Sequence, residues 1–282
     1  MKVNLIFNSL ILCLLLTYQC VANGATYGVV GDVGFVGREA EDLRRSLQRS
    51  KVRSMILPGD NLYDTEAETY ASVWSPWRKL GFEFPIVAIG NHHSSYEEEV
   101  AYFGIPGEVY AKREGESLFV VLNSDHDETG PTQAAWLRAQ LEAANSRFLF
   151  VVFHHPPVSI LHGWQERARF QLSIRPVLQE FRDKITALLV GHDHLAGLFE
   201  IDGLPMVLSG AGIEAFDSRR VEEHQDGRKV VTRWTYNASR TWARLDIGEK
   251  EVWVNFVDIP RDKVSCSALI SARPIQLRAN CD

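Results

Sequence analysis

The fold is decided by the stretch Met55-Ile56-Leu57-Pro58-Gly59-Asp60-Asn61-Leu62-Tyr63, in which a short apolar run is followed directly by a polar cluster. An apolar run of this length beside Pro and Gly is typical of a buried strand. Gly59 allows the backbone to turn sharply where the strand ends. A single Gly-Asp pair is usually only a turn, so the pattern becomes informative where it repeats.

The same pattern occurs five times along the chain. The polar clusters that follow apolar strands are Gly31-Asp32-Val33-Gly34, Gly59-Asp60-Asn61-Leu62-Tyr63, Gly90-Asn91-His92-His93, Phe153-His154-His155-Pro156 and Gly191-His192-Asp193-His194. In sheets with crossover helices, ligands bind at the carboxyl ends of the strands. A lone His after a strand is usually a satisfied edge residue, but five such clusters are difficult to explain as unrelated turns. Asp, Asn, Tyr and His at five strand ends predict a metal-binding constellation.

Strands and helices alternate along most of the chain, and strands alone follow. The alternating part predicts strands at residues 27–31, 55–57, 85–89, 117–123, 148–153 and 186–190, and helices at 38–48, 67–80, 132–143 and 169–181. The later strands are expected at residues 197–201, 205–208, 229–235, 241–247 and 251–257. This order predicts an α/β (α+β) fold with two packed β-sheets flanked by helices. No linker interrupts the pattern, so we expect one domain.

Composition and charge narrow the class of protein. The chain has 282 residues, of which 45% are apolar, which is enough to fill a large core. The formal net charge of -6 argues against nucleic acid as a partner, because that recognition needs a basic surface. The longest run of like charge, Glu97-Glu98-Glu99, predicts a solvated helix face.

Residues 1–24 have the pattern of a secretory signal peptide. Lys2 precedes a mostly apolar run over residues 3–16, and small residues follow it. This order predicts cleavage between about residues 22 and 25 and a secreted or periplasmic protein. The alternatives are a membrane anchor, which needs about 20 apolar residues, and a lipoprotein modified at Cys20. We expect no stable membrane span once the leader is removed.

Two cysteines remain after removal of the leader. Cys266 and Cys281 would lie in a compartment that permits disulfides, so we expect them to pair. The pair would tie down a C-terminal tail over residues 259–282, behind a main domain over residues 25–258.

The five clusters resemble the metal-binding blocks of the calcineurin-like metallophosphoesterases, and specifically the purple acid phosphatase branch. The likeness extends over about residues 27–257. Residues 59–63, Ala135-Trp136-Leu137 and Val207-Leu208-Ser209-Gly210-Ala211-Gly212 resemble the small tartrate-resistant acid phosphatases most closely. The resemblance implies a metallophosphoesterase-like four-layer sandwich.

The resemblance also implies two adjacent metal sites. Their ligands would be Asp32, Tyr63 and His194 in the first site, Asn91, His154 and His192 in the second, and Asp60 as a bridge between both. An anionic bridge offsets the repulsion between two neighbouring cations. His154 is preferred to His155 because the family ligand lies two residues before a proline, here Pro156.

Tyr63 distinguishes the purple acid phosphatase branch. Most metallophosphoesterases have a metal-binding His two residues after the first Asp, and this chain has Gly34 there. A phenolate from Tyr63 would replace that ligand and suits a trivalent ion. We therefore expect Fe(3+) in the Tyr63 site and a second divalent metal, Fe, Zn or Mn, beside it. The alternative is that Tyr63 only packs beside the loop.

The implied reaction is hydrolysis of phosphate monoesters by a metal-bound hydroxide, with an acidic pH optimum. His92 would contact the substrate phosphate and protonate the leaving group, unless it is only a structural loop residue. His162 resembles a second substrate-side histidine. His93 departs from the family, which usually has Asp or Glu at that position, and this change bears on metal choice, working pH and turnover.

Other functions remain open from the sequence. A phosphodiesterase or nucleotide pyrophosphatase would use the same site. A non-catalytic metal- or phosphate-binding protein would be expected to have lost a ligand, whereas all seven positions are filled. Substrate specificity would come from loops such as residues 94–107 and 216–228. Asn237-Ala238-Ser239 fits a glycosylation acceptor.

Overall fold

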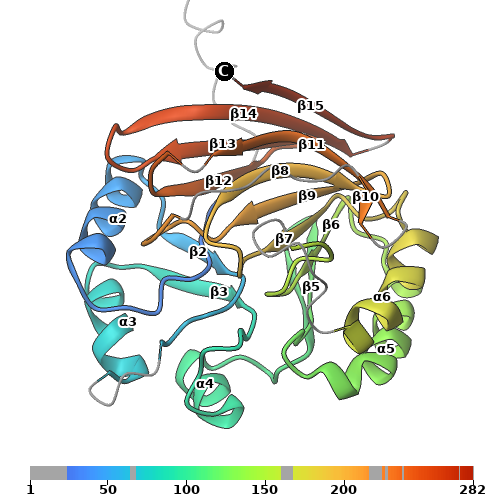
Figure 1. Cartoon of the computed structure of the whole chain (residues 1–282), viewed down its shortest axis with the longest axis horizontal. Coiled ribbons are helices and arrows are strands. Elements are labelled where there is room, and N and C mark those ends of the chain that lie inside the picture. Colours follow the sequence, from blue (N-terminus) through green and yellow to red (C-terminus); the bar gives the residue numbers. More distant parts are fainter. Residues whose placement is uncertain are drawn as a thin grey trace, which may run out of the picture.

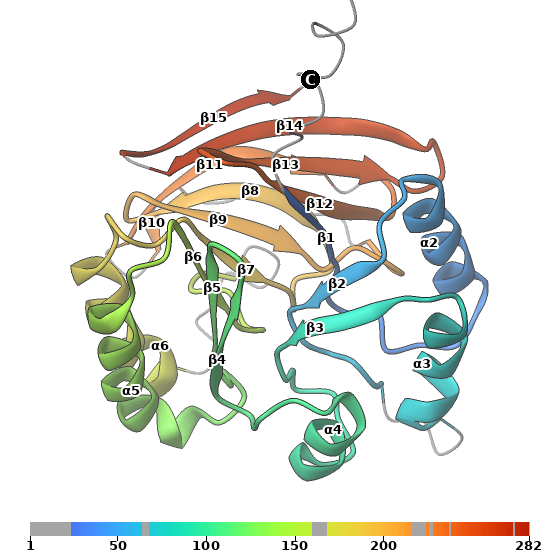
Figure 2. The ribbon, with the colours of Figure 1, turned by 180° about the vertical axis from the view of Figure 1, so that it is seen from behind.

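The computed structural model shows two large β-sheets packed against each other, with helices outside them (Figure 1). The same layers are seen from behind in Figure 2. The structure describes residues 24–63, 68–159, 168–215, 224–225, 228–236, 238–272 and 274–281. Most of the predicted leader, His162 and Asn237 therefore lie outside the described residues.

The first sheet has seven strands in the order β15-β14-β13-β12-β1-β2-β3. Their bounds are β1 Ala25–Val29, β2 Ser54–Leu57, β3 Glu83–Val87, β12 Thr241–Ile247, β13 Glu251–Asp258, β14 Lys263–Ala272 and β15 Ile275–Cys281. The strands β1, β2 and β3 are parallel, and β12 to β15 continue from β1 as antiparallel neighbours. The helices α2 (Arg38–Arg49) and α3 (Tyr70–Lys79) connect the three parallel strands.

The second sheet has eight strands in the order β10-β11-β8-β9-β7-β6-β5-β4. Their bounds are β4 Tyr110–Glu114, β5 Ser117–Val121, β6 Phe148–Val152, β7 Ala187–Val190, β8 Ala196–Ile201, β9 Leu204–Ser209, β10 His224–Gln225 and β11 Arg228–Tyr236. The central strands β5, β6, β7 and β9 are parallel. A short 3-10 helix (Asp127–Thr129) and α5 (Gly130–Ala143) join β5 to β6, and α6 (Ala168–Glu180) lies between β6 and β7.

These layers confirm the predicted fold. The helices α2 and α3 lie beside the first sheet, and α5 and α6 lie beside the second sheet on the opposite side of the molecule (Figures 1 and 2). The α/β arrangement of two packed β-sheets flanked by helices is therefore the four-layer sandwich expected from the sequence.

Alternation along β5 shows how one strand serves two cores. Phe119 and Val121 are buried in the core between the two sheets, whereas Leu118 and Val120 are buried in the core under α5 and α6. Successive side chains of a strand point to opposite faces, so a continuous apolar run fits a strand that is covered on both sides. The strand β5 is therefore covered on both faces.

The C-terminal segment differs from the expected tail, because it forms the two strands β14 and β15 at the edge of the first sheet. The strand β14 buries Cys266, Ala268 and Ile270 between half-buried residues, so it lacks the continuous apolar run of strands such as β6. The predicted disulfide between Cys266 and Cys281 is confirmed, and the two residues are paired opposite each other in β14 and β15.

Within the described residues, no helix is both long and apolar enough to cross a membrane.

Candidate metal centre

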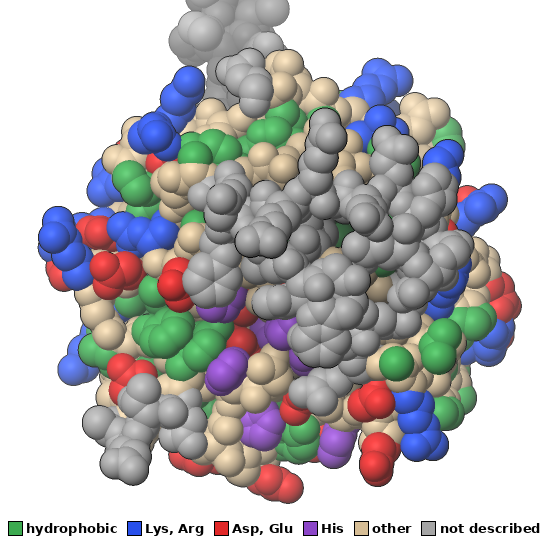
Figure 3. All heavy atoms as spheres, viewed as in Figure 1, with side chains coloured by type: hydrophobic (Ala, Val, Ile, Leu, Met, Phe, Trp, Pro, Cys, Tyr) green, Lys and Arg blue, Asp and Glu red, His purple; other side chains and the backbone are tan. Residues whose placement is uncertain are grey.

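The five polar clusters meet at one place, where strands of both sheets end. Asp32, Asp60 and Asn91 follow β1, β2 and β3 of the first sheet, whereas His154 and His192 follow β6 and β7 of the second. Histidine side chains gather on this face of the molecule, with acidic side chains beside them (Figure 3). The site therefore lies between the two sheets, as the carboxyl ends of parallel strands predict.

Three of the predicted ligands form the first half of the site. The Tyr63 hydroxyl lies 2.9 Å from Nε2 of His194 and 3.3 Å from Oδ1 of Asp32. Nε2 of His194 lies 3.4 Å from the same Asp32 oxygen. The other oxygen of Asp32 accepts a hydrogen bond from the backbone N–H of His192 at 2.9 Å, which fixes the orientation of the carboxylate.

The remaining four predicted ligands form the second half of the site. Oδ1 of Asn91 lies 3.2 Å from Nε2 of His154 and 3.1 Å from Nδ1 of His192. The same Nε2 of His154 lies 3.2 Å from Oδ1 of Asp60. Asp60 thus lies beside the second group, and Asp32, Asp60 and His154 have ligand atoms within 4.8 Å of one another. All seven side chains that the sequence singled out are therefore brought together.

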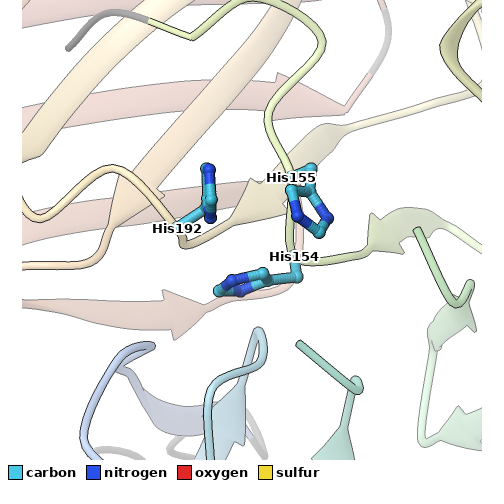
Figure 4. A group of neighbouring side chains, drawn as sticks. All are labelled: His154, His155 and His192. Atoms are coloured by element: carbon cyan, nitrogen blue, oxygen red, sulfur yellow. The ribbon is translucent and has the colours of Figure 1, made fainter. Parts of the chain in front are cut away.

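His155 also lies in this cluster, although the sequence favoured His154 alone. The ligand atoms of His154, His155 and His192 lie within 4.8 Å of one another, and Figure 4 shows the three side chains. The rings of His154 and His155 point away from the backbone in different directions (Figure 4). Nδ1 of His155 lies 2.9 Å from the hydroxyl of Ser124, whereas His154 faces Asn91 and Asp60. Both histidines belong to the cluster, and His154 as the ligand stays a prediction from the sequence.

The charges within the site shift the pKa values of its buried groups. Burial raises the pKa of Asp32 above its usual value, although His194 and His154 oppose this effect. Burial also lowers the pKa of His154, but the charge of Asp60 and its hydrogen bond outweigh it and raise that pKa to about 9. Burial and the charges of Asp32 and Asp60 raise the pKa of Tyr63 far above its usual range. Two acids and a phenol in one buried site are an environment that a cation would stabilise.

The backbone is strained at three of the predicted ligands. Asp32, Asp60 and His192 have φ angles of 60°, 55° and 70°, in the left-handed region that non-glycine residues rarely adopt. Such conformations cost about 1–3 kcal/mol each and persist only where the surrounding structure fixes them. Their concentration at one site is typical of a functional centre.

Two glycines allow the loops of the site to approach closely. A Cβ atom on Gly34 would lie 2.3 Å from the backbone N of Leu62, so no side chain fits where most metallophosphoesterases have a histidine. The backbone N–H of Tyr63 donates to the carbonyl of Gly34 at 3.0 Å. A Cβ on Gly90 would lie 2.1 Å from Oδ1 of Asp60. Gly34, at the position where most metallophosphoesterases have a histidine, is therefore linked by a backbone hydrogen bond to the position of Tyr63.

The donor set fits two cations. Nδ1 of His154 lies 3.0 Å from the carbonyl of Pro58 and donates to it, so Nε2, which faces the oxygens of Asn91 and Asp60, is the nitrogen that could bind a metal ion. A second hydrogen bond of this kind is the usual way in which a metal-binding histidine is oriented. His194 has an acidic neighbour instead, because its Nδ1 lies 3.7 Å from Oε2 of Glu214, within ion-pair distance but beyond hydrogen-bond distance. Carboxylate, phenol, amide and imidazole groups are all able to bind metal ions, so the donor set fits a dimetal site.

The other predicted site residues have different outcomes. His92 is exposed, its ring stacks on Tyr63 with centroids 4.5 Å apart, and its backbone N–H donates to Oδ1 of Asp60 at 2.9 Å. His93 faces away toward Asp125, with Nε2 3.4 Å from Oδ2. The hydrogen bond with Asp125 raises the pKa of His93, although burial opposes it. His162 belongs to a segment that the structure does not describe.

For Glu99 the predicted solvated helix face is wrong, and sequence reasoning did not single this residue out for burial. It belongs to α4 (Tyr96–Phe103), and its side chain is fully buried rather than on the solvated helix face expected for Glu97-Glu98-Glu99. The helix itself has sequence signals that could have located it, namely the N-cap residue Ser95 and the C-cap residue Gly104. The burial of Glu99 has no such signal, because its partners are distant in sequence.

Two packed mixed sheets with helices outside define the metallophosphoesterase fold, and solved structures share it. A purple acid phosphatase from yellow lupin matches with a TM-score of 0.65 and 13% identity, over 89% of this chain and 54% of that chain. A dimetal phosphatase from Danio rerio matches with a TM-score of 0.60 and 15% identity, over 88% and 98%. GAP50, described as the anchor in the inner membrane complex of Plasmodium, matches with a TM-score of 0.70 and 12% identity, over 89% of both chains. At these identities the likeness shows the fold alone.

In sequence, the chain is similar to tartrate-resistant acid phosphatase type 5. It is 37% identical to the human protein over 135 residues, which cover 45% of this chain and 39% of that protein. The rat protein is 35% identical over 134 residues, which cover 45% of this chain and 38% of the rat protein. The match thus spans less than half the length of these relatives, and no family model matches the chain. The resemblance to the purple acid phosphatases inferred from the motifs is confirmed.

Proposed function

We propose that this protein is a dinuclear metallophosphoesterase that hydrolyses phosphate monoesters. The main observation is the convergence of seven side chains with metal-binding chemistry, from five strand ends, at one place between the sheets. In the first half of the site, neighbouring donor atoms lie 2.9–3.4 Å apart, from Tyr63 through His194 to Asp32. In the second half they lie 3.1–3.2 Å apart, from His192 through Asn91 and His154 to Asp60. The partial sequence similarity to acid phosphatases supports the same reaction class.

The residues divide into two sets of ligands under this proposal. Asp32, Tyr63 and His194 would hold Fe(3+), because carboxylate and phenolate oxygens suit a hard trivalent ion. A divalent Fe, Zn or Mn ion would be held by Asn91, His154 and His192, and Asp60 would be shared. Two such cations would neutralise charge on the phosphate oxygens and would lower the pKa of bound water, a trivalent ion more strongly, and this effect would favour activity below neutral pH.

His92 is the residue that we assign to the leaving group. It is exposed at the site, whereas Asp60 and His154 are buried beneath it. Its ring is held by stacking on Tyr63, which in turn stacks on Phe35 with ring centroids 3.9 Å apart. A positioned imidazole can bind a phosphate oxygen or donate a proton to the departing alkoxide. His162 remains a candidate for a second substrate contact.

The proposed location is outside the cytoplasm, in secreted or periplasmic material, on the basis of the leader pattern in residues 1–24. The confirmed disulfide is consistent with such a compartment. The substrate would then be a small phosphoester that reaches the protein after export.

The experiment that tests the proposed reaction compares two substrates. The purified protein, supplied with iron and zinc, is assayed with p-nitrophenyl phosphate and with bis-p-nitrophenyl phosphate from pH 4 to 9. We expect the monoester to be cleaved faster and the rate to be highest in acid. Faster cleavage of the diester would instead identify a phosphodiesterase or nucleotide pyrophosphatase.

A non-catalytic role is the second candidate function, and one of the proteins that share the fold is the reason to test it. GAP50 shares the fold and is described as an anchor, so the fold alone does not imply catalysis. If the metal-loaded protein cleaves neither ester but binds metal or phosphate, this second function is the correct one.

A further inference from the structure

A buried carboxylate lies behind the proposed metal centre, on a helix that contributes no ligand. Glu99 has no exposed surface. Its Oε1 accepts a hydrogen bond of 2.6 Å from Nδ2 of Asn61, and its Oε2 accepts one of 2.9 Å from the hydroxyl of Tyr70. Both oxygens of Glu99 are therefore used to join α4 to α3 and to the loop that follows β2.

Asn61 is held by two further hydrogen bonds. Its Nδ2 also donates to the carbonyl of Ala88 at 2.9 Å, at the end of β3. Its backbone carbonyl accepts a hydrogen bond of 2.7 Å from Nε1 of Trp74 in α3. Asn61 itself is completely buried. Because both hydrogens of the Asn61 amide have acceptors, its orientation is set by Glu99 and Ala88 together.

Asn61 lies within the segment that supplies two of the proposed ligands. Asp60 precedes it and has the strained φ of 55°, and Tyr63 follows two residues later. A residue in such a conformation stays there only when its neighbours fix it. The hydrogen bonds of Asn61 hold the residue that follows Asp60, and the carbonyl of Asp60 accepts from the backbone N–H of Gly34 at 3.1 Å.

We propose that Glu99 is a positioning residue for the metal centre, which acts through Asn61 to hold Asp60 and Tyr63 where they bind metal. This inference rests on the proposed function, because it assigns Asp60 and Tyr63 to the two cations. Residues that orient metal ligands from behind commonly change metal affinity or activity by about 10- to 100-fold when they are replaced.

The chemical setting of Glu99 supports this role. Burial raises the pKa of its carboxyl to about 7, although the hydrogen bonds from Asn61 and Tyr70 lower it. An apolar side chain in this place would avoid that cost, so the carboxylate is an expensive way to fill space. Such placements are common where a polar group has a specific task.

The test replaces Glu99 by Leu and by Gln, with Glu97→Leu as the matched control. Glu97 and Glu99 both lie in the first turn of α4, so the two substitutions remove the same charge from the same helix end. Glu97 is exposed, whereas Glu99 is buried. Glutamine can still accept from Asn61 while donating to the Tyr70 oxygen, whereas leucine can do neither.

Three readouts on the full chain separate positioning from simple structural support. The first is the dissociation constant for each metal, and the second is the visible absorption band expected of a phenolate–iron pair. The third is hydrogen exchange of the segment 58–63 in the metal-free protein, where the Tyr63 amide is bonded to the carbonyl of Gly34. Circular dichroism checks that each variant is folded.

The proposal predicts about 10- to 100-fold weaker metal binding and a weakened band in Glu99→Leu. Exchange in residues 58–63 should be faster in this variant while the rest of the sheet stays protected. Glu99→Gln should restore most of each signal, and Glu97→Leu should match the wild type. If Glu99→Leu does not fold, the same three readouts are measured in Glu99→Gln and in Tyr70→Phe. In these variants we expect changes in the same direction as those predicted for Glu99→Leu, but smaller.

Unchanged metal affinity, band and local exchange in a folded Glu99→Leu protein would overturn the proposal. A uniform increase in exchange across the whole chain would also overturn it, because that result indicates general destabilisation. Failure of the proposed function looks different: the wild type would then cleave neither ester, or would bind no metal and show no band, while the exchange measurement would still report whether Glu99 holds the loop.

Discussion

Tyr63 is fixed on three sides by side chains from other parts of the chain. Its ring lies between Phe35 and His92, and its hydroxyl points at Asp32 and His194. An aromatic residue that only filled space would not need its hydroxyl among charged groups, since a buried hydroxyl is costly without polar partners. The stacking therefore serves to direct the phenol into the site, and it places His92 at the same time.

His92 should affect the chemical step more than metal binding. We expect His92→Ala to lower kcat by about 10²- to 10⁴-fold for a phosphate ester with an alkyl leaving group, because that leaving group needs a proton. The effect should be much smaller for p-nitrophenyl phosphate, whose leaving group is stable as an anion. Steady-state kinetics with both esters measures this difference, with His126→Ala as a control. Equal losses for the two esters would rule out proton donation by His92.

Glu99 should give the free energy of unfolding a pH dependence of defined sign. Burial raises its pKa to about 7 from an ordinary value of 4.5. The folded state therefore binds the proton more tightly, so the stability from this group is complete below about pH 4.5 and is lost as the pH rises through about 7. Relative to Glu99→Gln, which does not titrate, the wild type should lose about 3 kcal/mol between pH 4.5 and 8.

Urea unfolding of the two metal-free proteins across this pH range measures that difference. Other titrating groups affect both proteins alike and cancel in the comparison. A difference that stays constant with pH, or that changes in the opposite direction, would show that the Glu99 carboxyl is not protonated preferentially in the folded state.

At the scale of elements, the strand ends determine the site. The ligand-bearing loops follow parallel strands of two different sheets, and the sequence indicated them because each apolar run is followed at once by a polar cluster. The same reasoning could not find the contact between Glu99 and Asn61, which are 38 residues apart and belong to different elements. Periodicity locates elements along a chain, but it does not say which buried polar groups will meet.

The elements that were missed are those with weak apolar patterns. The helix α4 has three consecutive glutamates, and β14 buries Cys266 and Ala268 among serines. Their places depend on a neighbour, namely α3 for the helix and β13 for the strand. The sheet order and the pairing of β1 with β12 likewise follow from packing between distant segments.

Gly34 tests how closely the loops after β1 and β2 must approach. We expect Gly34→Ala to destabilise the protein by about 1–3 kcal/mol, because the new Cβ would overlap the backbone of Asn61 and Leu62. The same displacement should move Tyr63 and reduce iron binding. Thermal unfolding and metal analysis measure the two effects. Gly107→Ala is the control, because its Cβ would have no neighbour closer than 4.0 Å. Normal iron content in Gly34→Ala would show that the position of Tyr63 does not depend on Gly34.

At the scale of the whole molecule, the disulfide and the proposed metal centre lie in different parts of the fold. The disulfide joins β14 to β15 at the edge of the first sheet, whereas the metal centre lies where β1, β2 and β3 meet β6 and β7. In the sheet order, β13 and β12 separate the disulfide-bonded strands from β1, the nearest strand whose end bears a proposed ligand. The cluster of histidines depends instead on both sheets holding their relative position.

Removal of the disulfide should lower stability without lowering activity. The cysteines are 15 residues apart, and a loop of that length corresponds to about 3 kcal/mol in the chain-entropy model. We expect the double variant Cys266→Ser, Cys281→Ser to lose about this amount in urea unfolding while kcat for a phosphate monoester is unchanged. A large fall in kcat in the folded variant would mean that the edge of the sheet affects the site.

The most direct test of the central claim is the number of metal ions bound per chain, measured by elemental mass spectrometry after loading and desalting. Asp60 is shared by both proposed sites, so its removal should affect both cations. We expect two metal ions per wild-type chain, fewer than one per chain in Asp60→Ala, and two per chain in the control Asp183→Ala, whose side chain is 95% exposed. A wild type without bound metal, or an Asp60→Ala protein that still holds two ions, would contradict a dinuclear centre that shares Asp60.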